Sequence, residues 1–238
     1  FLGIAQPKQT QHFKNYLEWV NKGGQGNLEY LAKDYVINGR RDPEFLLEGA
    51  KSVIVAGIHY TPQIGWKDIY RPDNKEYGWI ASYACLPDYH HMLRHLFQQL
   101  GLFIQKVAKR TVNIKIFIDS GPVMEKDFAY QAGLGWIGKN SLLISPLFGS
   151  YCLLGCMFTD VYLQPDAPID GDICKDCKIC IKACPTSCIN SNRTIDASRC
   201  ISYQTIENPF LIPDNIKKKL AGWVFGCDIC QMVCPANR

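Results

Sequence analysis

The sequence lacks any apolar run near the roughly 18 residues that a membrane-spanning helix needs. The best candidate, residues 52–58 (SVIVAGI), has only the length of a strand. No secretory signal, internal repeat or low-complexity tract is visible. We therefore expect a globular cytoplasmic protein. Because the chain opens with FLGIA, which reads as the middle of a strand, we also expect its natural start to lie before Phe1.

A strong charge of either sign is also lacking, since 26 Lys and Arg stand against 22 Asp and Glu. Residues 61–115 contain eight Lys or Arg and four Asp or Glu, so the net charge of this stretch, +4, equals that of the whole chain. It also contains six Trp and Tyr residues, namely Trp66, Tyr70, Tyr77, Trp79, Tyr83 and Tyr89. Such a segment can track phosphates and stack bases. A solvated helix face with ordinary core aromatics explains the same composition and is the commoner case.

Hydrophobic patterning predicts a mixed α/β protein. We expect strands at 52–58, 114–118 and 151–159, and helices at 86–110 and 125–132. Strands that alternate with helices are typical of an α/β layer. The amino-acid composition changes at QPDAPIDGD (164–172), a linker rich in Pro, Asp and Gly. The sequence therefore predicts an α/β domain at 1–164 and a small cysteine-rich module at 165–238.

Cysteine is abundant but unevenly placed. Of the 12 cysteines, nine lie between Cys174 and Cys234. A chain this long does not need disulfide staples, and thiols two residues apart suit metal ligation better than a mesh of bridges. We infer a reducing compartment and a metal centre.

The cysteine spacing predicts two four-iron clusters. Residues 174–185 (CKDCKICIKACP) match the bacterial ferredoxin run, whose fourth cysteine serves the other cluster of a pair. The matching half is GCDICQMVCP at 226–235, and RCISY at 199–203 supplies its missing ligand. One cluster then takes Cys174, Cys177, Cys180 and Cys234, and the other takes Cys184, Cys200, Cys227 and Cys230. The alternative is structural zinc, which prefers two separate two-cysteine knuckles. Cys188, Cys85, Cys152 and Cys156 remain as spectators.

The chain resembles the epoxyqueuosine reductases, cobalamin-dependent iron–sulfur enzymes of tRNA modification. The resemblance runs through GRRDPEFLLEGAKSVIV, IASYACLPDYHHMLR, IDSGPVMEKDFAYQAGLGWIGKNSLLISPLFGSY, the cysteine run, RCISYQTIE and FGCDICQMVCP. It implies a nitroreductase-like, cobalamin-binding α/β domain followed by a ferredoxin-like module with two [4Fe–4S] clusters. Many relatives continue into a helical-repeat domain, so we expect either a short form or a truncated chain.

The resemblance also implies a reaction and its residues. Epoxyqueuosine at the wobble position of the tRNAs for Asp, Asn, His and Tyr would become queuosine, as two electrons and two protons enter and water leaves. Asp119 ends the apolar strand IKIFI, where it could equally cap a turn; the resemblance makes it the proton donor. Tyr89 and His90 match the substrate pocket. The residues expected to contact cobalamin are Arg40 (or its neighbour Arg41), Asp119, Lys139, Asn140, Ser141, Ser202 and Tyr203.

The expected partners are the tRNA anticodon loop and a low-potential flavodoxin or ferredoxin donor, with no membrane and a monomeric chain. Two other functions are compatible with the same cluster cysteines. A reductive dehalogenase of small haloorganic compounds would hold the same cofactors. An electron carrier or cobalamin reactivation partner would need the clusters but not Asp119.

Overall fold

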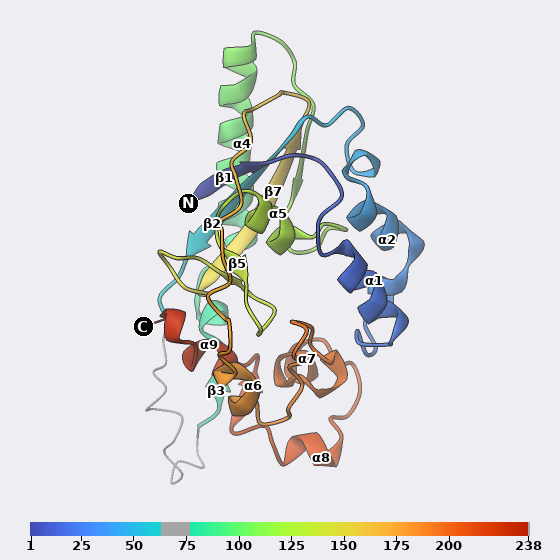
Figure 1. Cartoon of the computed structure of the whole chain (residues 1–238), viewed down its shortest axis with the longest axis vertical. Coiled ribbons are helices and arrows are strands. Elements are labelled where there is room, and N and C mark those ends of the chain that lie inside the picture. The colour runs from blue at the N-terminus through green and yellow to red at the C-terminus, as the bar shows by residue number, and fades with distance from the viewer. Residues whose placement is uncertain (63–76, 238) are drawn as a thin grey trace.

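The computed structural model describes residues 1–62 and 77–237 (Figure 1). Its largest sheet has the strand order β1-β2-β7-β4, and every neighbouring pair is antiparallel. The strands are β1 (Leu2–Ala5), β2 (Ser52–His59), β4 (Ile114–Phe117) and β7 (Cys152–Thr159). The centre of the sheet is the β2–β7 pair, aligned from Ser52 opposite Thr159 to His59 opposite Cys152.

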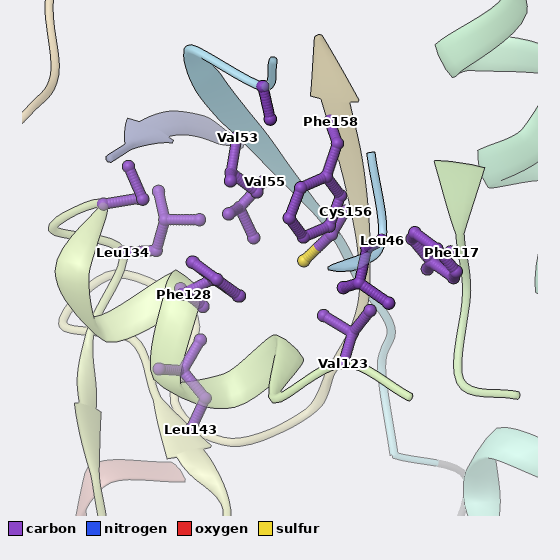
Figure 2. Close-up of a cluster of buried hydrophobic side chains, with 14 residues drawn as sticks. Leu46, Val53, Val55, Phe117, Val123, Phe128, Leu134, Leu143, Cys156 and Phe158 are labelled. Carbon is purple, nitrogen blue, oxygen red and sulfur yellow. The ribbon is translucent and has the colours of Figure 1, made fainter. Parts of the chain in front are cut away.

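Helices cover both faces of this sheet. Because side chains alternate along a strand, Val53 and Val55 of β2 face α5 (Glu125–Gln131) and pack with its Phe128, as Figure 2 shows. Ile54 points the opposite way and packs with Leu93 and other residues of α4 (Tyr89–Ala108). Each such side chain stabilises the fold by about 1.5–3 kcal/mol when fully buried. Burial on both faces explains why SVIVAGI is apolar without alternation.

The predicted elements are found close to their expected bounds, and the mixed α/β class is confirmed. The helix expected at 86–110 begins at Tyr89, because the Asp88 side chain accepts a hydrogen bond from the backbone N–H of His90 and caps it. The predictions for 52–58, 114–118, 125–132 and 151–159 correspond to β2, β4, α5 and β7, and the opening FLGIA contains β1.

Two helices near the N-terminus were not predicted. They are α1 (Phe13–Asn21) and α2 (Asp34–Arg41). α2 is short, polar and contains Gly39, so its sequence gives little helical signal. The glycine has a packing reason: a Cβ there would come within 2.8 Å of Pro122. α2 therefore lies directly against the turn that follows Asp119.

The remaining elements are short. The β5 (Trp136–Ile137) and β6 (Leu143–Ile144) strands form a hairpin. The cysteine module holds α6 (Ile179–Ala183), α7 (Ile201–Ile206), α8 (Asp214–Lys217), β8 (Trp223–Phe225) and α9 (Ile229–Met232). The 3₁₀ helices are η1 (Glu29–Ala32), η2 (Pro43–Phe45), η3 (Ser82–Cys85), η4 (Ala197–Arg199) and η5 (Pro235–Asn237).

The module and the larger domain interlock. The short strand β3 (Trp79–Ile80) pairs in parallel with β8, and the backbone N–H of Ser82 donates to Asp228 Oδ2 at 2.7 Å. The linker is held as well, since the backbone N–H of Ile4 donates to Asp166 Oδ2 at 2.8 Å. The boundary at residue 164 stays a prediction, and residues 79–82 contribute to the module's packing from the other side of it.

The basic, aromatic stretch at 61–115 does not form one uniform surface. Trp66 and Tyr70 lie outside the described residues. Trp79 packs against the module core around Trp223. Arg110 is paired with Asp160 at 3.0 Å, so its charge is partly neutralised. Within the described parts of the chain, no helix has the length and apolarity to cross a bilayer.

Candidate functional site

Asp119 lies just beyond β4 in a left-handed backbone conformation, with φ +58°. Residues other than glycine adopt this conformation infrequently, and Asp is one of the more tolerant types. The backbone N–H of Asp119 donates to Glu125 Oε1 at 2.7 Å, which fixes the turn to the first residue of α5. The Asp119 side chain remains 69% exposed. The turn therefore leaves the Asp119 carboxylate accessible to a ligand at the surface.

Tyr89 and His90 meet Asp119 from the first turn of α4. His90 Nε2 lies 3.9 Å from Asp119 Oδ2, and His90 Nδ1 lies 2.8 Å from Asp88 Oδ1. The Tyr89 ring stacks on the His90 ring with 4.1 Å between centroids. The Tyr89 hydroxyl is also a hydrogen-bond partner of Asp119. Burial, followed by the negative charge of Asp119, raises the pKa of Tyr89 well above its ordinary value. The predicted proton donor and the two predicted substrate residues thus form one cluster.

Glu125 and Lys126 belong to the same cluster, although sequence analysis did not select them. Burial, reinforced by the charge of Asp119, raises the pKa of Glu125 to about 8. Burial and the charge of Arg40 lower the pKa of Lys126, whose Nζ donates to the Ser141 carbonyl at 2.7 Å. Solvent still reaches both side chains, while protein surrounds them closely.

Arg40 enters this region from α2. Its guanidinium lies 4.5 Å from the Tyr16 ring centroid, a cation–π distance. Its Nε is buried and has no hydrogen-bond partner within the described chain. A buried donor without an acceptor is costly, so this N–H suits an acceptor supplied by a ligand. The location of Arg40 agrees with its predicted role beside a cofactor, which stays a prediction.

The module faces the same region through α7 and its surroundings. Tyr203 is buried, and its hydroxyl accepts from the backbone N–H of Asn27 at 3.2 Å; Ser202 is half-buried beside it. Burial raises the pKa of Tyr83, and the charges of Asp119 and of Glu207, which follows α7, act in the same direction. The Asp119 cluster and the end of α7 are therefore both close enough to Tyr83 to change its pKa.

The predicted cofactor residues of the GKNS segment contact the module instead of projecting freely. Lys139 Nζ donates to the Cys177 carbonyl at 3.0 Å and to the Lys175 carbonyl. Asn140 is 2% exposed, and its Nδ2 lies 3.5 Å from the Cys230 carbonyl. The Ser141 hydroxyl donates to the Arg193 carbonyl. These side chains join the β5–β6 hairpin to the cysteine module, and their role toward a corrin remains a prediction.

The eight ligand cysteines, in their two predicted groups, include thiols close enough to change one another's pKa values. Burial raises the pKa of Cys180 to about 11, with further contributions from three thiols of its own group, Cys174, Cys234 and Cys177. Burial raises the pKa of Cys227 to about 12, with contributions from two thiols of the other group, Cys200 and Cys184. Charges influence one another in this way only at short range. Cys180 also raises the pKa of Cys230 in the other group, so the two groups lie close to each other and the crossed ligand sets stay a prediction.

No group of three or more His, Cys, Asp or Glu side chains in residues 1–62 and 77–237 could hold one metal ion. A four-iron cluster gives each thiolate its own iron, so its ligands surround a larger object than a zinc ion.

Comparison with family models and known proteins decides the affiliation. Residues 173–237 match the model of the 4Fe-4S double cluster binding domain, which confirms the two predicted clusters. Residues 40–120 match the model described as epoxyqueuosine reductase QueG, DUF1730. The epoxyqueuosine reductase of Cyclobacterium marinum is 41% identical over 239 residues, covering 100% of this chain and 74% of that protein. The chain belongs to the epoxyqueuosine reductase family.

Solved epoxyqueuosine reductases share the fold. The Streptococcus thermophilus structure has a TM-score of 0.87 at 32% identity and covers 100% of this chain, which spans 62% of that protein. A structure with an epoxyqueuosine-modified tRNA-Tyr stem loop has a TM-score of 0.82 at 28% identity, with 61% of its chain covered. One from Bacillus subtilis, at 0.81 and 28%, is described with its catalytic aspartate loop swung out of the active site.

The fold extends to a second class of enzyme. A reductive dehalogenase, whose structure is described as suggesting a mechanism for B12-dependent dehalogenation, has a TM-score of 0.59 at 15% identity. All of this chain is covered but only 30% of the dehalogenase. Such a likeness establishes the shared fold and leaves the substrate open.

Proposed function

We propose that this epoxyqueuosine reductase family member reduces epoxyqueuosine to queuosine at the wobble position of tRNA. The observation that carries the proposal is the cluster of Asp119, Tyr89 and His90 beside a two-cluster module, in a chain whose relatives bear that name. The chain spans between 61% and 80% of the length of the curated relatives that it matches, so the activity is proposed for the whole enzyme to which these residues belong.

We infer that the large domain is a nitroreductase-like domain that binds cobalamin. When bound, cobalamin would supply a strongly reducing cobalt centre, charged by electrons from the clusters. Arg40, with its unpartnered buried Nε, and the half-buried Ser202 fit the polar edge of such a cofactor. Lys126 lies near Arg40 as well, and its Nζ donates to the Ser141 carbonyl. Asp119, Tyr203 and residues 139–141 complete the proposed cofactor contacts.

Residues of this chain are proposed to donate a proton to the departing epoxide oxygen. Opening the epoxide and releasing its oxygen as water requires two protons as well as two electrons. Asp119 is the exposed carboxyl at the centre of the cluster and is proposed to deliver a proton to the departing oxygen. His90 and the Tyr89 hydroxyl, both near Asp119, would orient that carboxyl and the substrate. The stacked Tyr89 and His90 rings also offer an aromatic surface for the modified base.

The proposed partners follow from this substrate. The anticodon loops of the tRNAs for Asp, Asn, His and Tyr are the expected ligands, and the relative solved with a modified tRNA-Tyr stem loop supports this choice. A flavodoxin or ferredoxin of low potential is proposed as the electron donor. We also propose that the protein is a cytoplasmic monomer.

The proposal is tested by turnover under anaerobic conditions. The protein, loaded with clusters and cobalamin, is incubated with a chemical reductant and tRNA carrying epoxyqueuosine, and the nucleosides are analysed by mass spectrometry. We expect queuosine to form, and Asp119→Asn to reduce its formation by about 10² to 10⁴-fold. Both clusters and cobalamin should remain bound in that variant. Full queuosine formation by Asp119→Asn would show that Asp119 is not the proton donor, whereas no queuosine formation by the loaded, unsubstituted protein would favour an electron carrier.

A parallel incubation separates the dehalogenase alternative. The substrate is 3-bromo-4-hydroxybenzoic acid, the compound in the structure of a related dehalogenase. We expect no bromide release from the loaded protein. Bromide release without queuosine formation would reverse the assignment.

A further inference from the structure

Cys188 is the cysteine of the module that the two ligand sets leave over. It is 3% exposed, and its Sγ lies 3.4 Å from Sγ of Cys184. Its side chain is also a hydrogen-bond partner of Cys200. Cys184 and Cys200 belong to the same predicted ligand set. The surplus thiol therefore lies between two sulfurs that serve one cluster.

The backbone holds Cys188 in this place. Its carbonyl accepts from the backbone N–H of Asp196 at 2.9 Å, and the next residue, Ile189, forms an isolated β-bridge with Ile195. These contacts bring the segment that leads to Cys200 back alongside residues 184–188. The backbone of Cys188 is thus held beside the segment that leads to Cys200, and the buried side chain starts from a fixed point.

Cys184 is surrounded by hydrogen-bond donors. Thr186 Oγ1 lies 3.4 Å from its sulfur, and the backbone N–H groups of Thr186 and Cys188 point to it as well. Thr186 is fully buried, so water does not compete for these contacts. A cysteine bound to iron is a thiolate and can only accept, whereas a free thiol carries one S–H donor. In the loaded module, Cys188 is the thiol that can donate.

We propose that Cys188 donates its one S–H···S hydrogen bond to the ligand sulfur of Cys184, with the sulfur of Cys200 as its other neighbour, and so raises the reduction potential of the cluster that both ligands bind. Hydrogen bonds to the sulfurs are one of the factors that set cluster potentials, because they stabilise the extra negative charge of the reduced state. The inference rests on the two-cluster module and is independent of the substrate. It would make one of the two clusters easier to reduce than it would be without Cys188.

The test is an anaerobic redox titration of the cluster-loaded protein, followed by electron paramagnetic resonance. Cys188→Ala removes the donor, and Cys188→Ser replaces it with a hydroxyl donor of smaller size. Cys152→Ala, in β7, is the matched control for losing a cysteine outside the module. Iron and sulfide are measured on every sample, so that cluster content and potential are read separately.

We expect Cys188→Ala to make the equilibrium constant for reduction of one cluster about tenfold less favourable, which is 59 mV for a one-electron couple. The reduction potential of the second cluster should be unchanged. In Cys188→Ser, the potential of the affected cluster should lie nearer to its value in the unsubstituted protein than in Cys188→Ala. Unchanged potentials for both clusters in Cys188→Ala would overturn the proposal. Loss of about four irons from both Cys188 variants would overturn it too, because Cys188 would then be a ligand. Failure of tRNA turnover alone would bear only on the proposed function.

Discussion

The backbone N–H of Asp119 donates a 2.7 Å hydrogen bond to Oε1 of Glu125. This contact joins Asp119, the left-handed residue after β4, to Glu125 at the start of α5. The Glu125 side chain therefore fixes the backbone from which the Asp119 side chain projects. Glu125 is a positioning residue in this arrangement, because its interaction with Asp119 is through the backbone. The strain of a left-handed residue, of the order of 1–3 kcal/mol, needs such support from its surroundings.

Removing this acceptor should impair the reaction more than the fold. We expect Glu125→Ala to lower kcat by about tenfold to 10²-fold, because a displaced proton donor loses its alignment. Glu125→Gln keeps an oxygen that can accept the Asp119 N–H and should retain most of the activity. Steady-state kinetics of both variants, with iron content measured alongside, tests this. Equal activity of Glu125→Ala and the unsubstituted protein would show that the contact does not position Asp119.

The same carboxyl should make stability depend on pH. Burial raises the pKa of Glu125 to about 8 from an ordinary 4.5. Between these values the folded protein keeps a proton that the unfolded chain has released, so the free energy of unfolding falls as pH rises. Glu125→Gln carries no titrating group there and should escape this loss.

Urea unfolding of both proteins at about pH 5.5 and about pH 8.5 measures the effect, since this interval covers most of the titration. We expect the stability of Glu125→Gln relative to the unsubstituted protein to increase at the higher pH. Contributions from other groups cancel in this comparison. If the two proteins change in parallel with pH, the raised pKa is wrong.

Much of the scaffold could be predicted, because each predicted element has a strong local signal. β2 and β7 are apolar on both faces, and α4 repeats its apolar residues at helical spacing. The cluster cysteines follow from spacing alone. By contrast, α2 is held by contacts such as Gly39 on Pro122, which no local pattern encodes, so tertiary packing overrides its weak propensity. α1 does have apolar residues at helical spacing, Phe13, Tyr16 and Val20, so this helix could have been predicted from its local signal.

The site was predictable only in part for a similar reason. Asp119 stands out because it ends an apolar strand, and the resemblance supplied Tyr89 and His90. Glu125 gives no such signal, since its proximity to Asp119 depends on the left-handed turn between them. The contact of Lys139 with the cysteine run depends on how two domains meet, and a single sequence does not reveal that.

The crossed ligand sets lead to a test by single substitutions. Cys177→Ala and Cys234→Ala should remove the same cluster, although the residues are far apart in the chain. Cys227→Ala should remove the other one. Each variant should fall from about eight irons to about four. Electron paramagnetic resonance of the reduced proteins identifies which cluster remains, and Cys85→Ala, at an exposed cysteine, serves as the control. Loss of different clusters from the first two variants would contradict the crossed assignment.

Lys139 distinguishes a role in the module from a role at the cofactor. Its Nζ donates to the carbonyl of Cys177 at 3.0 Å and to that of Lys175, which both belong to the first cysteine run. Hydrogen bonds from a charged donor contribute about 1.5–3 kcal/mol each, and Lys139→Met removes them. We therefore expect this variant to release iron to a chelator about tenfold faster from the cluster of Cys177, with the second cluster as an internal reference.

Lys139→Arg keeps a charged donor and should release iron at nearly the original rate. A lysine whose main partner is the corrin would behave differently. In that case Lys139→Met would bind cobalamin more weakly, while iron release stayed unchanged. Measuring both quantities on the same two variants decides between the contacts in this structure and the role implied by family resemblance, because each alternative changes one quantity and leaves the other alone.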